Sequence, residues 1–210
     1  MLLVILANDE QKEEILSNGT KDDCMINWIN RPDELTASKN CDAVFDLLFE
    51  ENGYDTSYLN NISSIPVFVS SVNKTIEEIG MPVTRINGWP GFLKRPVAEV
   101  ACADGAIRDR AETILDGLNK KAEWIPDVKG FISARVISMV INEAYFALEE
   151  NVSSKEEIDI AMKLGTNYPY GPFAWGSKIG LKKIVSLLTE LSLTEKRYEP
   201  AGLLLKEAIE

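Results

Sequence analysis

One stretch of this chain restricts the fold more than any other, because the helical run from Arg135 to Glu150 is apolar on almost every side. Its apolar members are Val136, Ile137, Met139, Val140, Ile141, Ala144, Tyr145, Phe146, Ala147 and Leu148. A helix of this kind must be covered on most sides by other protein. Since a single thin layer of helices cannot enclose it, we expect a second copy of the chain to supply part of the cover. The run therefore predicts a helical domain that forms a homodimer.

The composition limits the partners. The chain has 210 residues, 45% hydrophobic content and a formal net charge of −11. Nucleic-acid binding depends on Lys and Arg at the phosphates, so we expect no nucleic-acid partner. The three cysteines, Cys24, Cys41 and Cys102, are odd in number and have no CxxC spacing. We interpret them as reduced thiols of a cytoplasmic protein that has no metal site.

The first half alternates short apolar runs with amphipathic ones. We expect strands at Leu2–Ala7, Cys24–Ile29, Cys41–Leu48, Pro66–Ser70, Val83–Ile86, Val97–Cys102 and Ala122–Val128. We expect helices at Glu10–Ser17, Tyr54–Ile62, Thr75–Ile79 and Ala106–Lys120. Such alternation implies parallel strands with helices on both faces. The prediction is an α/β fold: a shortened Rossmann-like, doubly wound parallel sheet in residues 1–128, followed by an all-α dimerisation domain in residues 129–210.

The apolar start MLLVILA is too short to span a bilayer and has no basic segment before it. We therefore predict a buried strand there and no association with membranes.

The turn after this first strand lacks the features of a dinucleotide site. A Rossmann site needs glycines there, so that the backbone turns tightly and the helix N-terminus meets the pyrophosphate. Here the sequence reads ANDEQKEE, and no glycine occurs before Gly19. Asp9, Glu10 and Glu13 crowd the first turn, where acidic side chains themselves stabilise a helix N-terminus. An ordinary helix start is favoured over a disguised cofactor site.

The second half carries a resemblance to a known family. GFISARVISMVINEA, followed by EEIDIAMKLGTNYPYGPFAW, resembles the start of the C-terminal helical domain of the 3-hydroxyacyl-CoA dehydrogenase family. The tail KRYEPAGLLLKEAI is similar to the end of bacterial members. The resemblance implies an NAD-dependent oxidoreductase of fatty-acid and acyl-CoA degradation that dimerises through its C-terminal helices.

The first half resembles the family more faintly. CDAVFDLLFEENGYDTSYLNNISSIPVFVSSV is similar to a family segment that ends in a double serine, and Ser70 falls where the family has a hydroxyl that contacts the substrate. RINGWPGFLKRPVAEVA aligns with the segment His-Phe-Phe-Asn-Pro, which has a Glu twelve residues after the His. That Glu is present as Glu99, but Asn87 replaces the His. Ala134 replaces a family Asn that holds the substrate carbonyl.

The whole chain contains no histidine. In the family, a His oriented by a Glu takes the proton from the 3-hydroxyl while a hydride goes to nicotinamide. A carboxamide donates and accepts hydrogen bonds but cannot take up a proton near neutral pH. We therefore interpret Ser70, Asn87 and Glu99 as the family-equivalent positions of a degenerate site. We expect no bound cofactor, since NAD is implied by the resemblance alone.

Three functions remain compatible with these residues. The first is a working NAD-dependent dehydrogenase with an unusual site. The second is a noncatalytic protein that binds acyl-CoA or an acyl chain. The third is a dimeric interaction protein that pairs with itself or with an active paralogue. The missing histidine and glycines favour the second and third.

Overall fold

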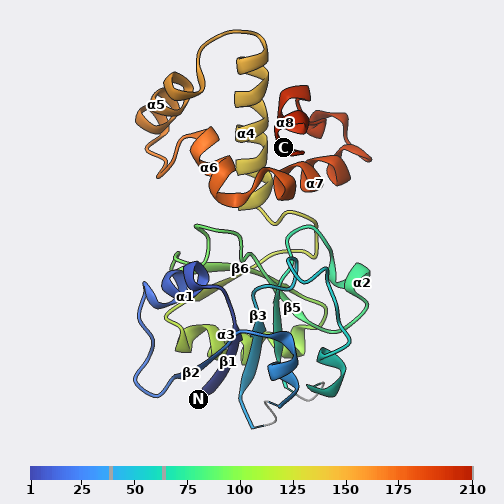
Figure 1. Cartoon of the computed structure of the whole chain (residues 1–210). Coiled ribbons are helices and arrows are strands. Elements are labelled where there is room, and N and C mark those ends of the chain that lie inside the picture. Colours follow the sequence, from blue (N-terminus) through green and yellow to red (C-terminus); the bar gives the residue numbers. More distant parts are fainter. Residues whose placement is uncertain (38–39, 63–64, 210) are drawn as a thin grey trace. The chain divides into compact units, whose positions relative to one another are not determined.

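A computed structural model describes residues 1–37, 40–62 and 65–209 of the chain (Figure 1). The chain divides into two compact units, Met1–Phe131 and Ile132–Glu210. Each unit has its own set of packed elements and is described by itself.

The first unit is built on a seven-stranded sheet with the order β2-β1-β3-β4-β5-β6-β7. The strands are β1 Leu2–Leu6, β2 Met25–Ile29, β3 Ala43–Asp46, β4 Val67–Ser70, β5 Thr84–Ile86, β6 Val97–Cys102 and β7 Lys121–Trp124. Strands β1 to β5 pair in parallel. The strands β3 and β4 are buried along their whole length, which explains why each has three consecutive apolar residues, 43–45 and 67–69, rather than an alternating pattern. The predicted α/β fold class is confirmed.

One pairing differs from the expected parallel sheet. Strand β6 runs antiparallel to β5, and β7 then runs parallel to β6. The connection from β5 to β6, residues 87–96, consists of turns and contains no helix. A parallel return needs a crossover of about a dozen residues or more, usually through a helix, whereas an antiparallel return needs only a short loop. The short connection therefore fixes the direction of β6.

Two layers cover the sheet. On one face lie the helices α1 (Asp9–Leu16) and α3 (Arg108–Gly117), which bury Ile15, Ile114 and Leu115 against it. The other face is covered by the 3-10 helices η1 (Pro32–Ala37) and η2 (Leu59–Ile62) and the turns around them. Two further single turns are α2 (Ile76–Ile79) and η3 (Gly105–Ile107). The sheet is thus covered on both faces, as expected, but by very short elements on one of them.

The helix expected at Tyr54–Ile62 is wrong for most of its length. Turns occupy residues 50–54, and only η2 is helical. Gly53 and Tyr54 have φ of 72° and 62°, in the left-handed region that a right-handed helix does not use. These two residues prevent a helix from starting where the apolar pattern begins.

The second unit consists of helices around a central one. They are α4 Ser133–Glu149, α5 Lys155–Thr166, α6 Pro172–Ile179, α7 Leu181–Ser192, η4 Lys196–Tyr198 and α8 Gly202–Glu207 (Figure 1). The long apolar helix predicted from the sequence is confirmed as α4, which packs against α6, α7 and α8. The buried amide of Asn142 on α4 donates to Glu199 O at 2.9 Å and accepts from Ala201 N at 2.8 Å. This amide fixes the chain that leads into α8.

Helix α6 is capped from α5. The Asp159 carboxylate accepts hydrogen bonds from Phe173 N at 2.7 Å and Ala174 N at 2.9 Å. A Cβ at Gly171 would lie 2.5 Å from the Asp159 Cα, so only glycine permits this approach. Asp159 and Gly171 therefore have a structural role, because they fix the start of α6 against α5.

Candidate functional site

The predicted site residues of the first unit meet where β4, β5 and β6 lie side by side. Ser70 ends β4, Asn87 follows β5, and Glu99 lies on β6. Ser70 and Asn87 are buried, whereas Glu99 is half-buried. Asn87 Nδ2 donates to Glu99 Oε2 at 3.0 Å, and Asn87 N donates to Glu99 O at 3.2 Å. The antiparallel β5–β6 pair is what brings the amide and the carboxylate together.

The Asn87 amide uses both of its polar atoms inside the protein. While Nδ2 binds Glu99, Oδ1 accepts from Trp89 N at 3.3 Å. A carboxamide in this position orients the loop and the carboxylate, but it does not abstract a proton from a hydroxyl.

Directly after Asn87, the backbone at Gly88 passes over Ser70. A Cβ at Gly88 would lie 2.7 Å from the Ser70 Cβ, well inside van der Waals contact. The absence of a side chain at Gly88 therefore lets the loop lie on the end of β4.

The fourth predicted residue belongs to the second unit. Ala134 lies in the first turn of α4 and is fully buried. Its methyl group offers neither a donor nor an acceptor for a carbonyl group.

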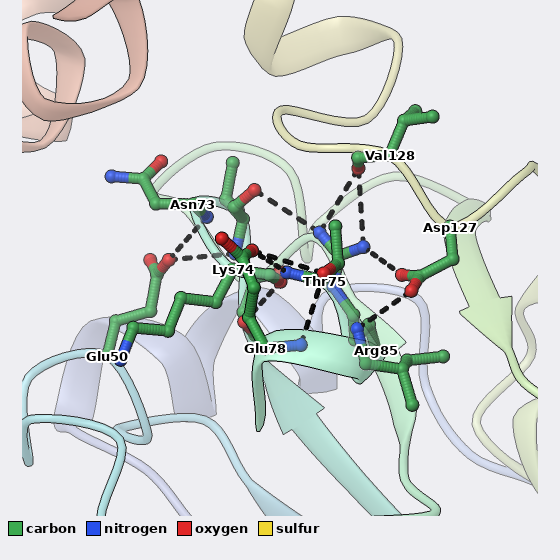
Figure 2. Close-up of polar contacts among 11 residues, drawn as sticks. Glu50, Asn73, Lys74, Thr75, Glu78, Arg85, Asp127 and Val128 are labelled. Atoms are coloured by element: carbon green, nitrogen blue, oxygen red, sulfur yellow. Dashed lines mark hydrogen bonds and ion pairs between the residues drawn. The ribbon is translucent and has the colours of Figure 1, made fainter. Parts of the chain in front are cut away.

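Glu50, which is not among the predicted site residues, connects three loops at the carboxyl edge of the sheet. Glu50 follows β3, and its Oε1 accepts from Val72 N at 2.8 Å and from Asn73 N at 2.9 Å (Figure 2). Its Oε2 accepts from the Nε1 of the fully buried Trp89 at 2.9 Å. Glu50 thus joins the loops that follow β3, β4 and β5.

A buried arginine forms a second tie beside it. Arg85 on β5 donates from Nε to Ser71 O at 2.9 Å and from Nη1 to Val128 O at 3.2 Å and to the Asp127 carboxylate (Figure 2). Asp127 Oδ2 also accepts from Ile76 N at 2.8 Å. Burial lowers the pKa of Arg85, and its ion pair with Asp127 opposes this. The sequence signal that could have indicated this interaction is the arginine inside the strand expected at Val83–Ile86.

The turn from β1 into α1 is closed by its own side chains. Asn8 Oδ1 accepts from Gln11 N at 2.9 Å, and Gln11 Oε1 accepts from Asn8 N at 3.1 Å, which forms a capping box. Asp9 and Glu10 occupy the first turn of the helix. Gln11 Nε2 donates to Leu47 O at 2.8 Å, just beyond β3. Two of the peptide N–H groups at this turn, those of Asn8 and Gln11, are thus engaged by the chain itself.

The described residues, 1–37, 40–62 and 65–209, contain no group of three or more His, Cys, Asp or Glu side chains arranged to hold a metal ion. Within the same residues, no helix combines the length and the apolar character needed to cross a membrane.

Residues 130–208 match the model of the 3-hydroxyacyl-CoA dehydrogenase C-terminal domain. The chain belongs to the 3-hydroxyacyl-CoA dehydrogenase family. A 3-hydroxyadipyl-CoA dehydrogenase of Escherichia coli strain K12 is 38% identical to this family member over 133 residues, which are 62% of the chain and 28% of that relative. A probable 3-hydroxybutyryl-CoA dehydrogenase of Bacillus subtilis strain 168 is 28% identical over 221 residues, which cover 96% of the chain and 75% of the relative. The chain therefore matches little more than a quarter of the length of the first relative.

A solved structure shows the same fold over nearly the whole family member. The (S)-3-hydroxybutyryl-CoA dehydrogenase from Ralstonia eutropha superposes with a TM-score of 0.73 at 19% identity and covers 98% of this chain and 92% of its own. This likeness extends the match from the helical unit to the Rossmann-like unit, as a likeness of fold.

Proposed function

We propose that this member of the 3-hydroxyacyl-CoA dehydrogenase family serves fatty-acid or acyl-CoA metabolism in the cytoplasm without catalysing the family's oxidation. It acts as a homodimeric interaction protein or as an acyl-CoA-binding protein. The observation that carries the proposal is the hydrogen bond from Asn87 Nδ2 to Glu99 Oε2. The family resemblance implies a proton acceptor at position 87, where this chain has a carboxamide, and the chain has no histidine that could replace it.

The family resemblance implies NAD, and the first turn of α1 does not fit it. A G-x-G-x-x-G fingerprint that begins at the last residue of β1 would place glycines at positions 6, 8 and 11. This chain has Leu6, Asn8 and Gln11 there, and Gln11 is bonded to Leu47 O. Asp9 and Glu10 would also repel a diphosphate at the helix N-terminus. We therefore propose that no NAD binds at this turn.

An apolar groove on the second unit supports the homodimer. The groove has a volume of about 510 Å³ and lies between α4 and α5, where its apolar lining includes Val140, Ile158 and Met162. Helix α5 buries none of its residues within one chain, and its Leu164 is 81% exposed. A second copy laid on α4 and α5 would remove this apolar surface from water. We expect the interface to exceed ~2,000 Å², as obligate dimers do.

Charge favours the dimer over coenzyme A as the principal partner. Residues 1–131 contain 13 Lys or Arg and 22 Asp or Glu, which gives −9, whereas residues 132–210 contain 9 and 11, which gives −2. A unit at −9 repels a polyanion, whereas two helical units at −2 approach one another at little electrostatic cost. Acyl-CoA binding would accordingly depend on local basic residues.

Native mass spectrometry of the purified protein tests the proposal. We expect the mass of a dimer, and a co-purified acyl-CoA would appear as an added mass on it. A monomer without ligand at micromolar concentration contradicts both forms of the proposal.

A second candidate function is that of an active dehydrogenase with an unusual site. Ser70 and Glu99 are residue types that the family resemblance implies at these positions, and Asn87 Nδ2 donates a hydrogen bond to Glu99 Oε2. This candidate requires a proton acceptor other than Asn87, and turnover measured by NADH absorbance decides it.

A further inference from the structure

Strand β2 is the outer strand at one edge of the seven-stranded sheet. It pairs with β1, and no strand of the described residues 1–37, 40–62 and 65–209 lies on its other side. Its five residues, MINWI, contain no charge and no proline. Edge strands present unpaired peptide groups to other chains, and proteins usually protect them with charges, prolines or very short strands. Since β2 has none of these protections, its edge is open to a further strand.

The peptide groups of Ile26 and Trp28 face this open side. Met25 N donates to Met1 O, on β1, at 2.9 Å. Because the peptide groups of successive strand residues point alternately to the two sides, Met25 and Asn27 bond to β1. Ile26 and Trp28 therefore each present one N–H donor and one C=O acceptor to the outside.

The side chains of β2 lie on both faces of this edge. Ile26 and Trp28 are partly buried against the core on the face that α1 and α3 cover. Ile29 is buried on the opposite face, which Met25 and Asn27 share. Asn27 is exposed, and Met25 is exposed to 63%. The open edge is thus an uncharged surface with an apolar side chain in water.

The strand is self-complementary about Asn27. In an antiparallel pair of two copies centred there, Ile26 of one copy lies opposite Trp28 of the other, and their outward peptide groups exchange hydrogen bonds. An aromatic side chain opposite a β-branched one is a favourable cross-strand pair. Asn27 then faces Asn27 of the second copy at the central, non-hydrogen-bonded position. Every contact occurs twice, as the two-fold symmetry of an isologous dimer requires.

Opposite charges meet at both ends of such a pair. In the same register, Asp23 of one copy faces Arg31 of the other. Asp23 is exposed, and the Arg31 side chain is 70% exposed. Within one chain Arg31 lies 3.3 Å from Asp33 and 3.4 Å from Glu34, but exposed ion pairs of this kind contribute little to stability. The seam is therefore uncharged at its centre and complementary at its ends, although residues 1–131 carry a net charge of −9.

We propose that β2 is an interaction surface for a second copy of this chain, whose own β2 pairs with it antiparallel about Asn27. The proposal goes beyond the helical dimer and does not rest on it, because it uses residues of the first unit alone. A five-residue edge buries less than about 1,200 Å², which is typical of weak interfaces. Where the helical units also pair, the two interfaces together link more than two copies.

Disulfide trapping tests the pair and its register. Asn27→Cys places two thiols at opposed positions whose Cα atoms are about 4.5 Å apart, within the range that disulfides span. Met25→Cys is the matched control, because Met25 lies on the same face and is exposed, but four strand residues, about 13 Å, separate it from its copy in this register.

The two variants are oxidised at tens of micromolar, and peptide mass spectrometry identifies the linked residues, so that bonds of the three native cysteines are counted separately. We expect Asn27→Cys to form a linked dimer at least about five-fold faster than Met25→Cys. Equal rates for the two variants, or no link at position 27, overturn the proposal.

A mixture of two charged variants tests the symmetry without oxidation. Asn27→Lys and Asn27→Asp each place like charges directly opposite one another, which disfavours the pair, whereas a mixture places Lys opposite Asp. Both variants also carry Val140→Glu, so that sedimentation reports the edge rather than the helical dimer. We expect the mixture, at hundreds of micromolar, to sediment faster than either variant alone. A mixture that sediments no faster than its components overturns the pairing.

The outcomes for the two interfaces are distinguishable. A native protein that is monomeric in light scattering, but whose Asn27→Cys variant forms the link, overturns the helical dimer and leaves the edge in place. A native dimer whose Asn27→Cys variant forms no link overturns the edge alone.

Discussion

Asp46 offers a quantitative test of the interior of the first unit. It ends β3 and is fully buried, with Oδ2 accepting from the Tyr58 hydroxyl and Oδ1 accepting from Leu48 N at 3.0 Å. Burial raises the pKa of this carboxyl from its ordinary 3.8 to about 6, and the hydrogen bonds from Tyr58 and Leu48 oppose the rise. The folded protein therefore keeps a charge at neutral pH in a place that favours the neutral acid.

The sign of the pH dependence follows from this rise. Between pH 3.8 and about 6 the folded state binds more protons at Asp46 than the unfolded state, so the contribution of Asp46 to stability falls as the pH rises through this window. A rise from 3.8 to about 6 corresponds to about 3 kcal/mol, because one pKa unit is worth about 1.4 kcal/mol. Asp46→Asn carries no charge at any pH and retains an acceptor for Leu48 N and a donor for Tyr58.

Urea denaturation of the native protein and of Asp46→Asn measures the effect. The measured quantity is the free energy of unfolding of Asp46→Asn minus that of the native protein. We expect this difference to rise by about 3 kcal/mol from about pH 3.5 to pH 7. Tyr58→Phe keeps the carboxyl but removes a donor, so its own pH dependence should persist and move to higher pH. A difference between native protein and Asp46→Asn that does not change with pH, or that changes in the opposite direction, refutes the reasoning.

Three further predictions concern the dimer, the helical unit and the buried ion pair. Val140→Glu places a charge in the apolar groove and should convert the dimer to a monomer in light scattering, whereas a native monomer at tens of micromolar rules the dimer out. Gly171→Ala brings a methyl group into overlap with Asp159 and should lower the melting temperature. Gly165→Ala meets nothing within 4 Å and should raise the free energy of unfolding by about 0.5–1 kcal/mol. Equal effects of the two substitutions would contradict the role of Asp159 as the cap of α6. Arg85→Met leaves a partly buried carboxylate without its cation and should reduce stability in urea by about 3 kcal/mol or more, and a loss below about 1 kcal/mol would show that the tie is dispensable.

The sequence predicted the elements whose patterns are local. The strands of the first unit lie where short apolar runs occur, and α4 lies where the apolar run is longest. The direction of β6 was not predictable from its own residues, because the apolar pattern of Val97–Cys102 is compatible with both a parallel and an antiparallel pair. The left-handed backbone at Tyr54 was also missed, since only its neighbour Gly53 signals it.

The candidate site was only partly predictable. The spacing of Asn87 and Glu99 indicated one site through the family resemblance, and β5 and β6 bring the two side chains together. The tie from Glu50 to Trp89 joins residues 39 positions apart, so no local period signals it. The capping box that includes Gln11 is visible in the sequence, but the bond from Gln11 to Leu47 O depends on the tertiary fold.

We expect that the protein does not oxidise 3-hydroxyacyl-CoA, and NADH absorbance with short- and medium-chain substrates measures this. We expect no NADH from the native protein, because loss of the general base alone costs about 10²–10⁴ in rate and the first turn of α1 does not fit the hydride acceptor. We also expect none from Asn87→His, which restores a base but leaves Gln11 bonded to Leu47 O at the first turn of α1. Turnover by the native protein near about one per second contradicts the account, since it is an ordinary enzymatic rate. Turnover by Asn87→His alone would show that the dinucleotide site is intact and that only the proton acceptor was lost.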